Sequence, residues 1–186
     1  MKQNQQHLSH LYQQKLGTAE QAAALIQSGD AVFMGEFAQN VEAVDAALAL
    51  RKNDLRDVTL ITTTRAKPLK CVEADPMGES FIWNDWHFSG LGRKNGERGL
   101  VSYIPLSYHQ GSRNVSSYSD VDVVVVQVAP MDANGFFNFS TSCSITPDYC
   151  RKAKKVIVEV NTQVPRCLGG LDEGIHISKI TMVVEG

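Results

Sequence analysis

A run of four consecutive valines, Val123 to Val126, constrains the fold of this chain more than any other feature. It lies in the segment VDVVVVQV, which is followed by a proline and an Asp-Ala-Asn-Gly turn. Successive side chains of a strand point to opposite faces of a sheet, so an unbroken apolar strand must be covered on both faces. Similar strands are predicted at residues 31–34, 58–64 and 155–160. We therefore expect an α/β protein with an open, mostly parallel sheet covered by helices on both faces.

Helix signals separate these strands. Thr18 and Gln21 form a capping box, which predicts a helix that stops at Gly29. Asn40 is the predicted N-cap of a second helix, VEAVDAALALRKN, in which Val41, Val44 and Leu48 share one face. The order strand, loop, helix, strand over residues 31–64 has the length of a βαβ unit with parallel strands.

The remaining pattern is less regular. Short helices are predicted near residues 68–75 and 147–154, and a hairpin-like segment passes through Asn134-Gly135. Residues 76–119 show no clear periodicity and are predicted to be irregular. A last strand, residues 180–184, lies at the C-terminus with nothing after it to pack against. We therefore expect residues 1–186 to be one domain of a longer protein.

Composition excludes several classes of function. The net charge is −2, so the sequence favours neither nucleic acid nor an anionic membrane as a partner. No signal peptide or transmembrane run is recognisable, which predicts a cytoplasmic protein. The four cysteines form no CxxC pair and the histidines are scattered, so we expect free thiols and no metal. The GLGRKNG stretch has the wrong spacing for a dinucleotide fingerprint, and no permanently bound cofactor is expected.

Two loops are candidates for a binding site, because ligands of open α/β sheets bind beyond the carboxyl ends of the strands. The first is Gly35-Glu36-Phe37-Ala38-Gln39, and the second runs from Gln127 to Gly135. Gly35 could bring backbone N–H groups toward a developing oxyanion, or it could only make the turn. Glu36 could be a nucleophile, but an exposed, solvated loop glutamate explains it equally well.

Five segments in order give a resemblance to a known family. They are FIWNDWHFSGLGRK, LVSYIPLSYHQ, DVDVVVVQVAPMDANGFFNFSTSCS, KKVIVEVNTQVPRCLGG and EGIHISKITMVVEG. Together they resemble the N-terminal domain of the acetyl-CoA hydrolase/transferase family, whose members include acetate, butyrate and 4-hydroxybutyrate CoA-transferases. The likeness covers residues 17–186.

The resemblance implies an enzyme of two similar α/β domains facing each other across a cleft. It exchanges coenzyme A, a co-substrate, between a short-chain acyl-CoA and a carboxylate through a glutamyl-CoA thioester. The family's glutamate lies in the second domain, so no catalytic residue is expected within this chain, which alone should be inactive and could belong to a homo-oligomer. The chain is then expected to supply one wall of the substrate pocket, with Gln127, Met131 and Asn138 opposite the Gly35, Glu36 and Phe37 loop. A ligand-sensing domain, an interaction module and an acyl-CoA hydrolase remain the alternatives.

Overall fold

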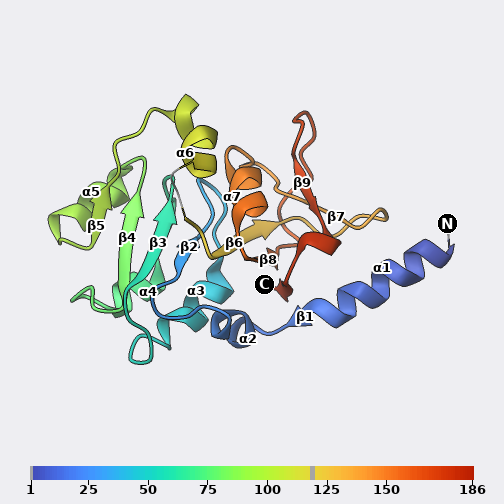
Figure 1. Ribbon diagram of the computed structural model, residues 1–186, viewed down its shortest axis with the longest axis horizontal. Helices are drawn as coiled ribbons and strands as arrows, with labels where there is room; N and C mark the ends of the chain where they lie inside the picture. Colours follow the sequence, from blue (N-terminus) through green and yellow to red (C-terminus); the bar gives the residue numbers. More distant parts are fainter. Residues whose placement is uncertain (1, 118–119) are drawn as a thin grey trace.

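The computed structural model describes residues 2–117 and 120–186. Within these residues the chain forms an eight-stranded sheet in the order β1-β10-β8-β6-β2-β3-β4-β5, and all neighbouring strands are parallel (Figure 1). Its strands are β1 (Leu16–Gly17), β2 (Ala31–Phe33), β3 (Val58–Thr62), β4 (Phe81–Asp85), β5 (Val101–Tyr103), β6 (Val123–Val128), β8 (Lys155–Val160) and β10 (Met182–Glu185). The predicted open parallel sheet is confirmed.

The valine strand β6 occupies the centre of this sheet, between β2 and β8. Its side chains alternate between two hydrophobic cores. Val123 and Val125 belong to one core, whereas Val124, Val126 and Val128 belong to the other, and all five are fully buried. Burial of each such side chain stabilises the fold by about 1.5–3 kcal/mol. The unbroken run is therefore explained by cover on both faces of the sheet.

Different helices cover the two faces. α2 (Ala19–Ala24), α3 (Glu42–Ala49) and α4 (Lys70–Ala74) contribute buried residues to the core that contains Val123. α6 (Gly111–Ser117), α7 (Thr146–Lys152) and Leu8 of α1 (Lys2–Lys15) contribute to the core that contains Val124. The remaining helices are α5 (Gly90–Glu97), η1 (Tyr108–Gln110) and η2 (Ile177–Lys179).

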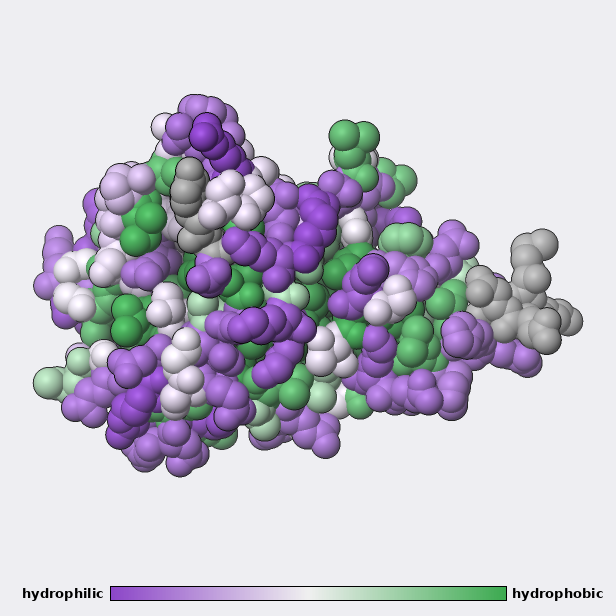
Figure 2. All heavy atoms as spheres, viewed as in Figure 1, coloured by the Kyte–Doolittle hydropathy of each residue, from purple (hydrophilic) through white to green (hydrophobic). Residues whose placement is uncertain are grey.

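A small antiparallel pair, β7 (Phe136–Asn138) and β9 (Gly174–His176), packs beside α7 and forms a second sheet. Because β7 pairs with β9 and not with β6, the Asn134-Gly135 turn does not close a hairpin with the valine strand. The segment above β9 projects from the body in Figure 1, and Figure 2 shows hydrophobic side chains on it. Leu168 and Leu171 of this segment are exposed.

Both predicted helix starts can be compared with the structure. At α2 the capping box is present, since Thr18 accepts from Gln21 N and the Gln21 side chain accepts from Thr18 N. This helix ends at Ala24, and Gly29, with φ +82°, lies in the turn before β2. At α3 the prediction was wrong. The N-cap is Val41, and the Asn40 side chain donates instead to Ala38 O at 3.0 Å.

A distant carboxylate caps α3 in place of Asn40. Glu159 of β8 is buried and accepts hydrogen bonds from Ala43 N and Val44 N at 3.1 and 3.0 Å. Negative charge stabilises a helix N-terminus because the first N–H groups of the helix lack backbone partners. No local sequence motif could reveal this cap, since the two segments are more than 100 residues apart.

Two further expectations are corrected. The described part of the segment 76–119, predicted to be irregular, contains β4, α5, β5, η1 and α6. The prediction failed because these elements are short and their strands lie toward the sheet edge, where β5 is largely exposed and apolar runs are not needed. The last strand, β10, has neighbours on both sides, since it pairs with β8 and with β1.

Candidate functional site

The sheet has a topological switch point at β2. From β2 the chain order proceeds outward through β3, β4 and β5 on one side, and through β6, β8 and β10 on the other. Ligands of open α/β sheets bind in the crevice that such a reversal leaves at the carboxyl ends of the strands. Here that place is formed by the β2 exit loop (residues 34–41), the β3 exit (residues 63–65) and the facing segment (residues 139–146).

The backbone of the β2 exit loop takes two left-handed conformations. Gly35 has φ +73°, and a Cβ at this position would lie 2.9 Å from Gln39 O, so only glycine fits. Phe37 has φ +49°, which is strained for a bulky residue, and its N–H donates to Thr64 O at 2.9 Å. Its half-buried ring lies 6.4 Å from the ring of Tyr108.

The facing segment is strained in the same way. Ser140 and Ser144 have φ values of +60° and +36°. Strained residues persist only where the surrounding structure holds them, and they cluster at functional sites. The two segments also touch, because Ala38 N donates to Ser142 Oγ at 3.2 Å and Tyr108 Oη is hydrogen-bonded to Ser144 Oγ.

Glu36 is fully buried between the β2 exit loop and the facing segment. Its Oε1 accepts from Ile145 N at 3.1 Å, from Thr146 N at 3.2 Å and from Thr146 Oγ1 at 2.9 Å. Burial raises the pKa of Glu36 to about 7, against the opposing effect of hydrogen bonds from Thr146, Ser144 and Thr63. The prediction of an exposed, solvated glutamate was therefore wrong. No nearby apolar pattern marks this loop position as buried.

Several buried side-chain oxygens at this edge of the sheet lack a hydrogen-bond partner among the described residues. Such atoms are rare in proteins, and they are satisfied by water or by a ligand. They belong to the exits of β2, β3 and β4 and to the facing segment: Glu36 Oε2, Asn40 Oδ1, Thr63 Oγ1, Asp85 Oδ2 and Ser140 Oγ. This concentration indicates a polar site at the carboxyl ends of the strands.

Asp85 supplies a second buried carboxyl at this edge, on the opposite face of the sheet. Its Oδ1 accepts from Thr62 Oγ1 at 2.8 Å, and Thr62 Oγ1 in turn accepts from Trp83 Nε1 at 2.8 Å. Burial raises the pKa of Asp85 to about 6. Neither Asp85 nor Thr62 could be selected from the sequence, because β4 was not predicted.

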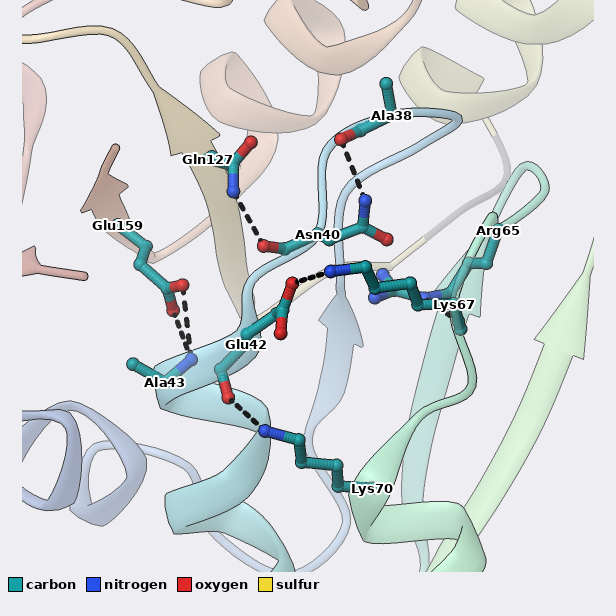
Figure 3. A network of polar contacts seen from close by, with 9 residues as sticks. All are labelled: Ala38, Asn40, Glu42, Ala43, Arg65, Lys67, Lys70, Gln127 and Glu159. Carbon is teal, nitrogen blue, oxygen red and sulfur yellow. Dashed lines mark hydrogen bonds and ion pairs between the residues drawn. The ribbon is translucent and has the colours of Figure 1, made fainter. Parts of the chain in front are cut away.

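A charged network borders the same edge (Figure 3). The buried Arg65 donates to Met34 O at 2.6 Å and so ties the β3 exit to the end of β2. Lys67 forms an ion pair with Glu42, and Lys70 Nζ donates to Glu42 O at 3.4 Å. Burial lowers the pKa of Arg65, and the carboxylates of Asp45, Asp85 and Glu159 oppose that shift. The position of Arg65 just after a strand is the one sequence signal that could have marked it.

The structure brings some of the predicted pocket residues together. Gln127 of β6 donates from Nε2 to Asn40 O at 2.8 Å, so Gln127 adjoins the loop that carries Gly35, Glu36 and Phe37. Asn138 is buried and serves the backbone: Nδ2 donates to Cys167 O at 2.8 Å, and Oδ1 accepts from Ser140 N and Cys167 N. Asn138 therefore adjoins the site by holding the facing segment. Met131 packs against the core on the α7 side of the sheet.

Other site types find no support in the described part of the chain. Within residues 2–117 and 120–186, no cluster of His, Cys, Asp or Glu side chains could hold a metal ion, and all four cysteines are free. No described helix is long and apolar enough to cross a membrane. The GLGRKNG stretch does follow a strand and forms α5, contrary to expectation. Its Gly92 and Gly96 pack against the ring of Phe88.

Comparison with known proteins places this site in a family context. The family profile "Acetyl-CoA hydrolase/transferase N-terminal domain" matches residues 1–186. Butyryl-CoA:acetate CoA-transferase of Anaerostipes caccae is 43% identical over 176 residues, which is 94% of this chain and 40% of that protein. A probable butyrate:acetyl-CoA coenzyme A-transferase of Syntrophomonas wolfei is 36% identical over 97% of this chain and 40% of its own length. The chain thus spans about 40% of the length of these relatives.

Solved structures give the same result. RipA from Yersinia pestis superposes with a TM-score of 0.87 at 28% identity, covering 96% of this chain and 44% of RipA. The 4-hydroxybutyrate CoA-transferase of Porphyromonas gingivalis matches at a TM-score of 0.66 and 23% identity, a likeness of fold alone, over 96% of this chain and 41% of that one. The sequence and the fold agree, and the chain belongs to the acetyl-CoA hydrolase/transferase family, of which it forms the N-terminal domain.

Proposed function

We propose that this chain is the N-terminal half of an enzyme that moves coenzyme A between a short-chain acyl-CoA and a carboxylate such as acetate. The observation that carries the proposal is the 43% identity to a butyryl-CoA:acetate CoA-transferase over almost the whole chain. The strained, partly unsatisfied polar site at the switch point of the sheet supports it. Acyl-CoA and short-chain carboxylates are then the substrates, and coenzyme A is a co-substrate without a permanent site. The proposed compartment is the cytoplasm.

In the proposed reaction a glutamate outside this chain is the nucleophile. Its carboxylate attacks the thioester carbonyl of the acyl-CoA and expels the coenzyme A thiolate, which leaves an acyl-glutamyl anhydride. The thiolate then attacks the glutamyl carbonyl, which forms a glutamyl-CoA thioester and releases the acid as a carboxylate. The incoming carboxylate reverses the two steps and leaves with coenzyme A.

This domain would supply a fixed wall for those steps. Each attack passes through an oxyanion, and preorganised donors at the crevice lower its energy. The β2 exit loop is fixed at both ends for that task, by Arg65 on Met34 O and by Gln127 on Asn40 O. A rigid wall also excludes water, which would otherwise hydrolyse the anhydride.

An exchange assay on the full-length protein tests the proposal. Butyryl-CoA and acetate are supplied together, and acetyl-CoA is quantified by chromatography, while free thiol is followed with and without acetate. Acetate-dependent formation of acetyl-CoA with little free thiol is the expected result. Thiol release that does not depend on acetate would favour an acyl-CoA hydrolase, and no reaction with any short-chain acyl-CoA would favour a binding module.

A second assay concerns the chain alone. Residues 1–186 contain no residue that we assign as the nucleophile, so the isolated chain should produce no acetyl-CoA under conditions in which the full-length enzyme turns over. Turnover by the isolated chain would refute the assignment of the nucleophile to a second domain.

A further inference from the structure

Glu36 is the one carboxyl that joins both walls of the crevice. It is carried by the β2 exit loop, and all three hydrogen bonds to its Oε1 come from Ile145 and Thr146 of the facing segment. Nothing in the reaction proposed above uses this group. A buried carboxyl in a crevice costs stability unless the surrounding groups compensate it, so its presence requires an explanation.

The contacts of Glu36 constrain its neighbour Phe37. Phe37 has a left-handed backbone, which costs about 1–3 kcal/mol for such a residue and persists only when the flanking contacts enforce it. On one side Phe37 N donates to Thr64 O, and on the other side the Glu36 carboxyl is fixed to residues 145 and 146. These contacts direct the Phe37 ring toward Tyr108, which is hydrogen-bonded to Ser144 of the facing segment.

We infer that Glu36 is a positioning residue, which holds Phe37 in place as an apolar wall for the acyl group of the thioester substrate. This inference rests on the proposed function. The half-buried Phe37 ring and the exposed Tyr108 ring offer apolar surface beside the polar atoms at the strand ends. An acyl-CoA needs that combination, because its short hydrocarbon chain adjoins a reacting carbonyl.

Ionisation of Glu36 weakens this arrangement. The surrounding ionisable groups are the Cys143 thiol on the facing segment, Tyr108 on η1 and Arg65 at the β3 exit. The negative charge of Glu36 raises the pKa of Cys143 further above the value that burial gives, so the thiol does not compensate the carboxylate. Because the pKa of Glu36 is raised to about 7, its neutral form predominates below neutral pH.

The test is a double-mutant cycle in the full-length enzyme. The quantity measured is the ratio of kcat/KM for butyryl-CoA to kcat/KM for acetyl-CoA. Glu36→Ala and Phe37→Ala should each change this ratio by about tenfold, the range in which contacts of one or two methylenes discriminate substrates. If Glu36 acts through Phe37, adding Glu36→Ala to Phe37→Ala should produce no further change.

Controls separate positioning from a general loss of structure. Asp75→Asn removes another buried carboxylate that accepts backbone N–H bonds, from Glu79, Ser80 and Phe81, at the opposite edge of the sheet. It should lower thermal stability and leave the substrate ratio unchanged. Glu36→Gln keeps the acceptor oxygen but cannot ionise, so it should preserve the ratio below pH 7 and remove its change between pH 6 and 8.

Each outcome decides the inference. Additive effects of Glu36→Ala and Phe37→Ala, or a ratio within twofold of wild type in folded Glu36→Ala enzyme, would overturn it. If Glu36→Ala does not fold, Glu36→Gln decides, since a pH profile like that of wild type would also overturn it. Wild-type enzyme without exchange activity would instead refute the proposed function. Hydrogen exchange of residues 34–41 then reads the loop, and unchanged protection in Glu36→Gln between pH 6 and 8 would overturn the positioning role.

Discussion

Replacement of Glu36 by glutamine should change how the stability of this chain depends on pH. Burial raises the pKa of Glu36 from 4.5 to about 7, so the folded state binds a proton that the unfolded state has already lost between these two values. One pKa unit corresponds to about 1.4 kcal/mol, so the wild-type chain should lose about 3 kcal/mol of unfolding free energy as the pH rises from below 4.5 to above 7. The neutral amide of Glu36→Gln should not contribute this loss.

Urea denaturation at pH 5 and at pH 8 measures the effect. Only the difference between the wild-type and Glu36→Gln chains matters, because other titrating groups contribute equally to both. The unfolding free energy of wild type minus that of Glu36→Gln should fall by about 2–3 kcal/mol from pH 5 to pH 8. Parallel pH dependences would refute the reasoning, because Glu36 would then titrate in the folded chain as it does in the unfolded chain.

Three other predictions concern single substitutions. Glu159→Ala should lower the unfolding free energy by about 1–3 kcal/mol in urea denaturation, because Ala43 N and Val44 N lose a buried acceptor; a loss below 0.5 kcal/mol would show that α3 needs no cap from β8. Gly35→Ala should cost more stability than Gly29→Ala, since both residues have positive φ but only at Gly35 would the new Cβ lie 2.9 Å from a carbonyl oxygen; equal midpoints in thermal melts would contradict this. Gln127→Ala in the full-length enzyme should lower kcat/KM for acyl-CoA and for acetate, because the β2 exit loop loses its tie at Asn40 O, and unchanged kinetics for both substrates would remove Gln127 from the site.

Much of the fold was predictable because the central strands carry their own evidence. A valine run such as that of β6 has only one arrangement that hides every side chain, a parallel strand between two layers. The capping box at Thr18 was equally local, since both partners lie within four residues. The β4 to β5 region was not predictable in this way, because its strands are short and exposed residues such as Ile82 and Tyr103 interrupt the apolar pattern.

The candidate site was only partly predictable, because its residues converge from distant segments. The Gly35 loop and Gln127 were predictable from their positions at strand ends. The burial of Glu36 was not, since it depends on Thr146, which is 110 residues away in the sequence. The same holds for Glu159, which caps a helix on the far side of β6. Contacts of this length leave no periodic signal in a single sequence.

The most direct test of the account is to locate the covalent intermediate. Full-length enzyme incubated with butyryl-CoA alone, then digested and analysed by mass spectrometry, should carry coenzyme A on one glutamate, and that glutamate should lie outside residues 1–186. Coenzyme A attached to Glu36, or to any other residue of this chain, would contradict the account.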